Sequence, residues 1–376
     1  MKKITVALTA LAAVGAVALA GCSSDSTSSA PTKPTETGSK TPGGDAAGFE
    51  DGATIGISLP QKTSQNWVEA EQLFNQGLKA AGYNPVVQFA NNGAAEQQSQ
   101  IEAMIQQGAK VIVIGAVDGS QLSTQVEAAR EAGIKIVAYD RLIKETDAVD
   151  LYVAYDNFKV GELQGQALLD GLAARKGAGP YNIELIAGSN DDANSKPFFE
   201  GAISVLQPKI DDGTLKILSG QTTQEQVATE GWDPANVQKR MDSIISGFYK
   251  DAKLDGILSP NDTLGRAAIA SATAAGLDVP VVTGQDSEDD SVASVAKGEQ
   301  YQTIFKDTRG LVDAVLKQID LAKAGQEFSS NGVANNGTID VPADYLTPVS
   351  VTQENILEAY ANDEARLDIA KKNLAS

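Results

Sequence analysis

Short apolar runs alternate with amphipathic helical spacings along most of the chain. Each short apolar run predicts a buried strand, and each helical spacing that ends at a glycine predicts a helix with that glycine as its C-cap. In the first half of the chain the predicted strands are 54–59, 84–90, 110–115 and 134–139, and the predicted helices are 68–81, 94–107 and 121–132. This alternation favours a parallel sheet that is covered by helices on both faces.

The same alternation returns in the second half. The predicted strands there are 181–187, 215–220, 255–259 and 279–283, and the predicted helices are 198–206, 234–249 and 266–275. We therefore expect an α/β fold that is built from two similar units in tandem. A chain of 376 residues is long enough for two lobes of ordinary domain size.

Acidic residues stand at or just beyond the ends of predicted strands in both units. In the first unit these are Asp118 and Asp140, and in the second unit they are Asp262 and Asp286. In open parallel sheets, ligands bind beyond the carboxyl ends of the strands. Two such sheets facing each other would line a cleft with polar side chains from both sides.

The N-terminus carries the pattern of a secretory signal. Lys2 and Lys3 precede an alanine-rich apolar run over 4–20, which is short for a membrane span and ends in Leu-Ala-Gly-Cys at 19–22. This ending resembles the lipobox of bacterial lipoproteins, in which the cysteine receives the lipid and the signal is cut just before it. The resemblance implies a signal peptide at 1–21 and a lipidated Cys22, with an ordinary signal peptide beside a chance cysteine as the alternative.

The segment after Cys22 has almost no large apolar residue. From Ser23 to about Gly48 it consists mainly of Ser, Thr, Pro, Gly and Asp. Such a segment cannot bury enough surface to offset the entropy lost on ordering. We therefore predict that residues 22–52 comprise the lipidated cysteine and a flexible tether.

Composition removes several classes of function. Cys22 is the only cysteine and the chain has no histidine, which excludes an internal disulfide, a Cys/His zinc site and a His-based catalytic triad. The net charge of −19 disfavours nucleic acid as a partner, because nucleic-acid binding needs a basic face. Neither a metal nor a cofactor is expected.

Several motifs occur in the same order as in a known family. They are Ala-Tyr-Asp-Arg-Leu at 138–142, Tyr-Asp-Asn-Phe at 155–158, Trp-Asp-Pro at 232–234, Ser-Pro-Asn-Asp at 259–262, Gly-Gln-Asp at 284–286 and Thr-Ile-Phe-Lys-Asp-Thr at 303–308. From about Ala53 to about Gln353 the chain resembles the type I periplasmic binding proteins for sugars. The resemblance is strongest to the group that binds multiple sugars or xylose.

The resemblance implies two Rossmann-like lobes with parallel sheets, joined by a three-strand hinge that closes on the ligand. It places the crossings between the lobes near Asp156, Glu288 and Asn335. The expected parts are an N-terminal lobe of 53–155 plus 289–334, a C-terminal lobe of 156–288 plus 335–360, and a C-terminal tail of 361–376.

The resemblance also implies a sugar site. Hydroxyl groups need polar partners that donate and accept, and the apolar faces of a pyranose stack on aromatic rings. The expected ligand-binding residues are Lys62, Asn66, Trp67, Asp140, Arg141, Asn194, Trp232, Asn261, Asp286 and Lys306. Asn66 departs from the family, which often has Arg at this position, so the preference for particular hydroxyls is open.

Structural roles compete for several of these residues. Asp140 and Arg141 could pair with each other to cap a loop, Trp67 could only pack against the first helix, and Lys306 could be a solvated surface charge. Two further residues, Asp192 and Asp262, are secondary candidates. For Asp262 the competing role is the N-cap of the helix that follows.

The sequence thus predicts an extracytoplasmic, lipid-anchored binding protein that captures an aldopyranose such as glucose, galactose, xylose or arabinose. Its expected partners are an ABC transporter permease with its ATPase, and we expect it to act as a monomer. One alternative is a sugar-sensing accessory that presents its ligand to a membrane receptor. A glycoside-acting enzyme, suggested by paired carboxylates, is less favoured because the acidic residues are interleaved with Asn, Arg and Lys. A transcriptional repressor is excluded, because no DNA-binding helices precede residue 53.

Overall fold

The computed structural model of the protein describes residues 48–62, 64–91 and 93–374. The predicted signal peptide and lipid-attachment site lie outside the described residues. Within these ranges, no helix combines the length and the apolar character that crossing a bilayer requires.

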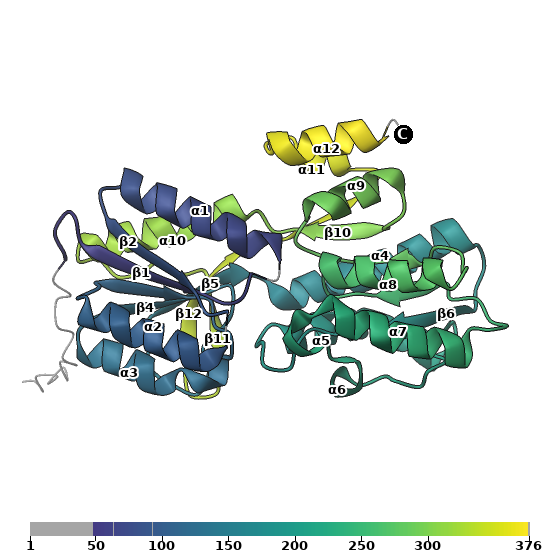
Figure 1. Ribbon diagram of the computed structural model, residues 1–376, viewed down its shortest axis with the longest axis horizontal. Coiled ribbons are helices and arrows are strands. Elements are labelled where there is room, and N and C mark those ends of the chain that lie inside the picture. Colours follow the sequence, from purple (N-terminus) through teal and green to yellow (C-terminus); the bar gives the residue numbers. More distant parts are fainter. Residues whose placement is uncertain (1–47, 63, 92, 375–376) are drawn as a thin grey trace, which may run out of the picture. The chain divides into compact units, whose positions relative to one another are not determined.

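The N-terminal lobe is a seven-stranded sheet with helices on both faces (Figure 1). Its strands run in the order β11-β12-β5-β4-β3-β1-β2, and all neighbours are parallel except β11 and β12. The strands are β1 (Thr54–Leu59), β2 (Asn84–Phe89), β3 (Val111–Ile114), β4 (Lys135–Tyr139), β5 (Leu151–Tyr155), β11 (Gly332–Asn335) and β12 (Asp340–Leu346). Helices α1 (Gln65–Ala80) and α10 (Thr308–Lys323) cover one face, and α2 (Ala94–Gln106) and α3 (Ser123–Glu131) cover the other.

The C-terminal lobe repeats this arrangement on a smaller scale. Its four parallel strands run in the order β7-β6-β8-β9, which matches β2-β1-β3-β4 of the first lobe. The strands are β6 (Tyr181–Leu185), β7 (Leu215–Lys216), β8 (Gly256–Leu258) and β9 (Val281–Val282). Helices α4 (Asn157–Lys176) and α5 (Ser195–Asp211) pack on one face, and α7 (Pro234–Phe248) and α8 (Asp262–Ala274) pack on the other. A short helix, α6 (Gln224–Val227), and a 3-10 turn (Glu230–Trp232) connect β7 to α7. The expected α/β fold with mostly parallel sheets is confirmed.

A further apolar cluster joins the last part of the chain to the C-terminal lobe. Strands β10 (Gln302–Phe305) and β13 (Val349–Thr352) form an antiparallel pair, and β10 lies beside the end of β9 because Tyr301 N donates to Val282 O at 3.1 Å. Helices α9 (Asp289–Lys297), α11 (Ile356–Ala359) and α12 (Glu364–Leu374) pack around this pair. The expected C-terminal tail is therefore mostly a helix with a buried face.

The strand pairing contradicts two of the three expected crossings. The chain leaves the first sheet at Asp156, but α9 and β10 still belong with the second lobe, so it returns only at Lys306. It then forms α10, β11 and β12, and β12 pairs with β5 in the first sheet. The last crossing therefore follows Leu346. The predictions near Glu288 and Asn335 were wrong because the partner sheet of a strand is set by distant hydrogen bonds.

The folded part also begins earlier than expected. Phe49 N donates to Lys323 O at 3.2 Å, and the ring of Phe49 lies 6.2 Å from that of Tyr83. Residues 49–52, which the sequence predicts as part of the tether, thus pack against the N-terminal lobe.

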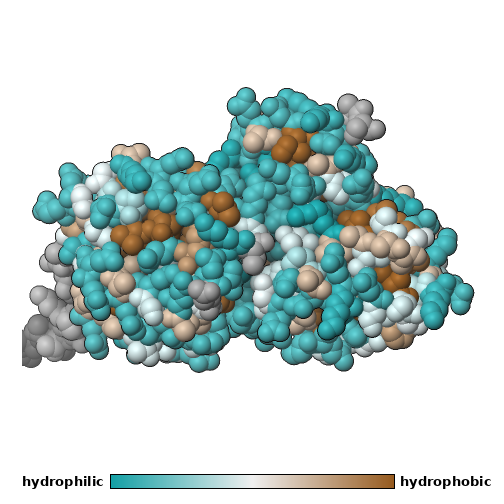
Figure 2. Space-filling model, in the orientation of Figure 1, coloured by the Kyte–Doolittle hydropathy of each residue, from teal (hydrophilic) through white to brown (hydrophobic). Residues whose placement is uncertain are grey.

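The surface is mostly polar, in keeping with the strong negative charge. Figure 2 shows one face that is largely hydrophilic, with separate apolar spots on it. The large exposed apolar side chains of the described residues, such as Phe158, Phe248 and Val333, are distributed over different elements. Scattered apolar residues of this kind do not indicate a docking face.

Candidate ligand-binding cleft

A small polar cavity lies where the carboxyl ends of strands from both lobes come together. The first lobe supplies Ser64, Asn66, Trp67, Asp140 and Arg141; the second supplies Asp192, Asn194, Phe198, Trp232, Asn261, Gln285 and Asp286; the crossing after β10 supplies Lys306. Every expected ligand-binding residue except Lys62 lies in this lining. The position agrees with the general rule for ligand sites in open α/β sheets.

Lys62 points elsewhere. Its Nζ lies 3.2 Å from Glu71 Oε2 and 4.3 Å from the centre of the Phe89 ring, and its side chain is 47% exposed. The loop after β1 thus directs Lys62 towards Glu71 and Phe89, whereas Asn66 and Trp67 line the cavity. Lys62 therefore does not line this cavity, and its role in ligand binding stays a prediction.

Three lining residues have unusual backbone conformations. Asp140, Asp286 and Trp232 have φ angles of 60°, 91° and 55°, a region that residues other than glycine seldom occupy. Asp140 N donates to Val153 O at 2.8 Å, and Asp286 N donates to Ile304 O at 2.9 Å, so each aspartate is anchored to a neighbouring strand. Strained backbone of this kind is concentrated at functional sites.

Asp140 and Asp286 occupy matching positions after β4 and β9, and Lys306 lies between them. The Nζ of Lys306 is 3.2 Å from Asp286 Oδ1 and 3.8 Å from Asp140 Oδ2, and all three side chains are 10% exposed or less. Burial opposes the charge on Lys306, but the carboxylates of Asp286 and Asp140 outweigh it and raise the pKa of the ammonium group. Lys306 is therefore a buried bridge between the lobes and not a solvated surface charge.

A second ion pair crosses the cavity. Arg141 Nε of the first lobe lies 3.0 Å from Asp192 Oδ2 of the second, although this N–H is not aimed at the oxygen well enough to make a hydrogen bond. Arg141 Nη1 donates to Ala116 O at 3.1 Å, and its guanidinium lies 5.3 Å from the centre of the Trp67 ring. Burial raises the pKa of Asp192, with Arg141 acting in the opposite direction. The partner of Arg141 is therefore Asp192 and not Asp140.

The two tryptophans of the chain both reach the cavity. Trp67 also packs edge-on against Tyr139, with ring centres 6.1 Å apart, so it serves the core of the first lobe as well. Trp232 Nε1 donates to Asp192 Oδ2 at 3.1 Å, which fixes the orientation of that ring. The ring fits only beside a glycine, because a Cβ on Gly188 would lie 2.2 Å from it.

The amide side chains play unequal parts. Asn194 Nδ2 donates to Asp140 O at 3.0 Å, and its Oδ1 accepts from Asn157 Nδ2 at 2.8 Å, so this residue already links the lobes. Asn66 Oδ1 accepts a hydrogen bond from Ser64 Oγ at 2.7 Å. By contrast, Gln285 Oε1 is buried without a hydrogen-bond partner among the described residues. An unsatisfied buried acceptor at this place is free for a ligand that donates.

Asn261, and not Asp262, caps the helix that follows, and Asn261 also lines the cavity. Asn261 Oδ1 accepts from Leu264 N at 2.9 Å, so Asn261 is the N-cap of α8. Asp262 is fully buried away from the cavity and accepts from Gln300 Nε2 at 2.8 Å and from Thr303 Oγ1 at 2.9 Å. The predicted capping role of Asp262 is therefore wrong. Asp262 does not line the cavity either.

The cavity is filled mainly by its own side chains. Its volume is about 30 Å³, which is room for little more than one water molecule. Three buried carboxylates face two cations in it, so acceptors outnumber positive charges. Such a lining suits a neutral ligand with many hydroxyl donors once the lobes separate enough to admit it, and it disfavours an anion. No group of His, Cys, Asp or Glu in the described ranges is arranged to hold a metal ion.

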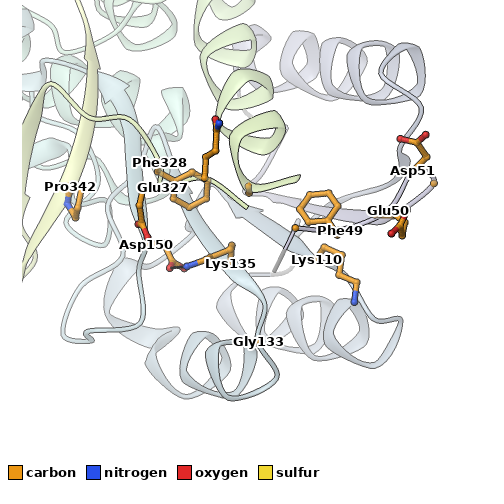
Figure 3. A pocket seen from close by; sticks show the side chains of 15 residues that line it. Phe49, Glu50, Asp51, Lys110, Gly133, Lys135, Asp150, Glu327, Phe328 and Pro342 are labelled. Atoms are coloured by element: carbon orange, nitrogen blue, oxygen red, sulfur yellow. Dashed lines mark hydrogen bonds and ion pairs between the residues drawn. The ribbon is translucent and has the colours of Figure 1, made fainter. Parts of the chain in front are cut away.

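A much larger hollow lies at the opposite, amino-terminal edge of the first sheet (Figure 3). It has a volume of about 680 Å³ and is lined by residues that include Phe49, Lys110, Lys135, Asp150 and Phe328. Its clearest polar feature is the half-buried pair of Lys135 Nζ and Asp150 Oδ1 at 2.9 Å. Because buried polar groups do not converge there, size alone does not make it the ligand site.

Ser64, Phe198 and Gln285 were not predicted. Phe198 lies in a predicted helix with no local sign of a binding role, yet its ring lies 5.6 Å from Lys306 Nζ. Gln285 stands beside Asp286 in a motif that was recognised, and this adjacency was the one available signal. Ser64 lies in the loop before α1, next to residues that were named.

Comparisons with known proteins agree with the geometry. The family model described as "Periplasmic binding protein domain" matches residues 55–327. The chain is 44% identical over 312 residues to the multiple sugar-binding periplasmic receptor ChvE of Rhizobium radiobacter, a match that covers 81% of this chain and 88% of that protein. It is 34% identical over 310 residues to the D-xylose-binding periplasmic protein of Escherichia coli (strain K12), covering 82% of this chain and 89% of that one.

A solved structure shows the same similarity in three dimensions. An ABC transporter solute binding protein from Clostridium phytofermentans, crystallised with bound β-D-glucose, superimposes with a TM-score of 0.79 at 36% sequence identity. The match covers 84% of this chain and 99% of that chain.

Proposed function

Because the chain belongs to the type I periplasmic sugar-binding proteins, we propose that it captures a monosaccharide between its lobes and delivers it to an ABC importer. Delivery to a permease is typical of this family. The partners under this proposal are the permease and its ATPase, and the protein acts as a monomer.

The observation that carries the proposal is the facing pair Asp140 and Asp286. They come from matching positions in different lobes and share the buried cation of Lys306. A sugar that entered here would donate hydroxyls to both carboxylates and accept from Lys306 and Arg141, so its contacts would span the lobes. Contacts to both lobes are what make a closed form more stable with ligand than without it.

The ligand class follows from the lining. Carboxylates, amides and cations match hydroxyl groups, and the rings of Trp67, Trp232 and Phe198 offer apolar surfaces. We propose an aldopyranose such as glucose, galactose, xylose or arabinose. Similar proteins are named for xylose or contain β-D-glucose, which supports this class. Asn66, where the family often has Arg, would be one determinant of the preferred sugar.

An enzymatic role is less consistent with the same geometry. Asp140 and Asp286 both face Lys306, and Asp192 faces Arg141, so each carboxylate is already paired with a cation. A glycosidase uses one carboxyl group as the acid and a second as the nucleophile or base, whereas these carboxylates are engaged with Lys306 and Arg141. The proposal is therefore binding without turnover. Sustained release of product from nitrophenyl glycosides by the pure protein would contradict it.

An extracytoplasmic location carries over from the periplasmic relatives. We further propose that lipid on Cys22 anchors the protein at the outer face of the cell membrane. Replacing Cys22 by Ala should move the protein from the membrane fraction to the soluble fraction, and continued membrane retention would count against lipidation. The sensory alternative shares the same site, and co-purification with a receptor instead of a permease would favour it.

The function is tested by a thermal-shift screen of the purified protein over monosaccharides. We expect a stabilising shift with at least one aldopyranose and none with disaccharides or amino acids, because a ligand that binds only the folded form raises the melting temperature. A screen in which no monosaccharide shifts the melting temperature would contradict the proposal.

A further inference from the structure

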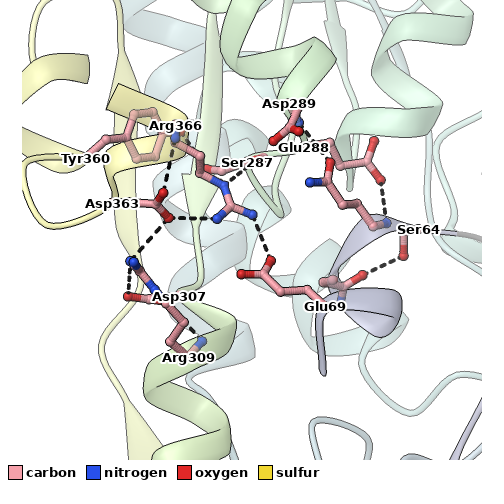
Figure 4. Close-up of polar contacts among 12 residues, drawn as sticks. Ser64, Glu69, Ser287, Glu288, Asp289, Asp307, Arg309, Tyr360, Asp363 and Arg366 are labelled. Atoms are coloured by element: carbon pink, nitrogen blue, oxygen red, sulfur yellow. Dashed lines mark hydrogen bonds and ion pairs between the residues drawn. The ribbon is translucent and has the colours of Figure 1, made fainter. Parts of the chain in front are cut away.

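The lobes meet at a second place, outside the cavity. Arg366 on α12 reaches across from the second lobe to Glu69 on α1 in the first, with Nη2 donating to Oε2 at 3.0 Å (Figure 4). Neither residue belongs to the lining of the cavity.

Every part of the Arg366 side chain has a partner. Nη1 donates to Asp363 Oδ2 at 2.7 Å, and Nε donates to Ser287 O at 2.8 Å. The side chain is 7% exposed, and its guanidinium lies 5.7 Å from the centre of the Phe305 ring. Burial opposes the charge, but Glu69 and Asp363 outweigh it and raise the pKa of Arg366. The group is therefore a fixed cation directed at the other lobe.

A second ion pair crosses the same boundary with the charges reversed. Arg309, at the start of α10 in the first lobe, places Nη2 3.2 Å from Asp363 Oδ2 and donates from Nη1 to Asn362 O at 3.0 Å. Asp307 holds the guanidinium in place, accepting from Nε at 2.8 Å. We refer to Arg366, Asp363, Glu69 and Arg309 as the C-terminal latch.

A third contact supports the latch. Gln65, at the start of α1, accepts a hydrogen bond from Asp289 N at 3.0 Å through its Oε1. Asp289 begins α9, on which α12 packs. The first two turns of α1 therefore contact two helices of the second lobe, α9 through Gln65 and α12 through Glu69.

The latch is connected to the sugar cleft through one residue. Ser287 directly follows Asp286 and also has a positive φ angle, 49°. Its carbonyl accepts from Arg366 Nε, and its Oγ accepts from Tyr360 OH at 2.7 Å. Arg366 of the latch, together with Tyr360, thus also holds Ser287, the residue next to Asp286 of the cleft.

We propose that the C-terminal latch, through which segment 356–374 contacts the first lobe, stabilises the closed arrangement of the lobes and thereby slows release of the bound sugar. This inference rests on the proposed function. A ligand that binds the closed form gains apparent affinity in proportion to the population of that form. The latch pairs bring no atom to the sugar, so they change the affinity for every ligand alike.

The competing explanation is that α12 only stabilises the second lobe. A change at Glu69 distinguishes the latch from this competing explanation, because Glu69 lies on α1 of the first lobe and is not needed to fold α12. The variant Glu69→Gln keeps the size of the side chain and removes the charge. The matched control is Glu71→Gln on the same helix, whose carboxylate pairs with Lys62 within the first lobe.

The experiment measures two quantities on the purified wild type, E69Q, R309Q and E71Q. Stopped-flow displacement gives the dissociation rate of D-glucose, or of D-xylose where glucose does not bind. Small-angle X-ray scattering gives the radius of gyration with and without sugar. We expect E69Q and R309Q to release sugar on the order of tenfold faster and to increase the radius of gyration, with E71Q equal to the wild type.

Unchanged dissociation rates and radii in both E69Q and R309Q would overturn the latch, as would an equal change in E71Q. If the wild type binds no monosaccharide, the proposed function fails while the scattering measurement still decides on the latch. In that case an unchanged radius in E69Q and R309Q overturns it.

Discussion

The two zones where the lobes meet are held by different kinds of contact. In the cleft, Lys306 joins Asp140 to Asp286 and Arg141 faces Asp192, and these are the groups that a sugar would engage. In the latch, Arg366 joins Glu69 and Arg309 joins Asp363 outside the cavity. Cleft contacts must be exchanged when a ligand enters, whereas latch contacts can form with or without it. The cleft therefore determines which sugar binds, whereas the cleft and the latch together determine how stable the closed arrangement of the lobes is.

The zones also differ in their access to water. The cleft side chains are 10% exposed or less, while Glu69 is 23% and Arg309 34% exposed. Exposed ion pairs are weakened by salt far more than buried ones. Raising the salt concentration should therefore weaken the latch while leaving the cleft contacts largely intact.

The largest effect should follow from changing a cleft aspartate. We expect Asp140→Asn and Asp286→Asn each to raise the Kd for the preferred monosaccharide by roughly a hundredfold or more, since each removes a charged acceptor of buried hydroxyls. Asparagine is chosen over alanine because it tolerates the positive φ at both positions. Isothermal titration calorimetry measures the change.

The matched control for these variants is Asp118→Asn. Asp118 also follows a strand, β3, but its carboxylate accepts from Ser120 N and it does not line the cavity. Its Kd should equal that of the wild type. Normal binding by D140N or D286N would show that the cleft has been assigned wrongly.

Next in size is removal of the bridging cation. Lys306→Met leaves Asp140 and Asp286 buried without a partner, and breaking a buried pair costs about 3–5 kcal/mol before the site relaxes. We expect a lower melting temperature for the empty protein, measured by calorimetry. The double variant K306M/D286N should recover part of the loss. An unchanged melting temperature in K306M would mean that the bridge contributes nothing to the empty state.

A smaller effect concerns pH. Burial raises the pKa of Asp192, Asp262 and Asp286, so the folded state holds these protons more tightly than the unfolded state. These three carboxyl groups contribute fully to stability when the pH is below their pKa in the unfolded chain. The contribution is lost as the pH rises through their higher pKa in the folded protein. The chain has no histidine to titrate between these limits. The melting temperature of the empty protein should therefore rise as the pH is lowered from neutral towards the ordinary aspartate pKa of 3.8.

The variant Asp262→Asn sharpens this prediction, because Asp262 is fully buried beside Glu288. It should reduce the slope of melting temperature against pH. Asp363 should show the opposite dependence on pH. Its pKa is lowered by Arg366 and Arg309 despite its burial, so its contribution to stability is lost only when the pH falls below the ordinary aspartate value of 3.8. A pH-independent melting temperature in the wild type would contradict the assignment of buried acids.

Local patterns sufficed for the strands and helices that glycines delimit, such as β1, α1 and β3. They failed for α4, which was not predicted, because glycines inside it look like breaks. Gly161 is required by packing, since a Cβ there would lie 2.1 Å from Phe198 O in α5. The partner sheet of β10 and of β12 could not be predicted either, because strand pairing depends on residues far away in the chain.

A residue of the candidate site could be predicted only where the sequence immediately around it indicates a binding role. Asp140 and Asp286 stand at strand ends within recognised motifs, and both tryptophans are conspicuous by their rarity. Asp192 was undervalued because its partner, Arg141, comes from the other lobe. For the same reason nothing in the local sequence around Glu69 or Arg366 indicates that they meet.

The central claim is that a monosaccharide binds in the cleft between the lobes. The only two tryptophans, Trp67 and Trp232, both line this cavity, so intrinsic tryptophan fluorescence reports on it directly. Titration of the purified protein with the sugar that gives the largest thermal shift should change the emission saturably, at one sugar per chain, and D140N should abolish the change. A sugar that stabilises the protein without altering the emission would bind elsewhere and contradict the account.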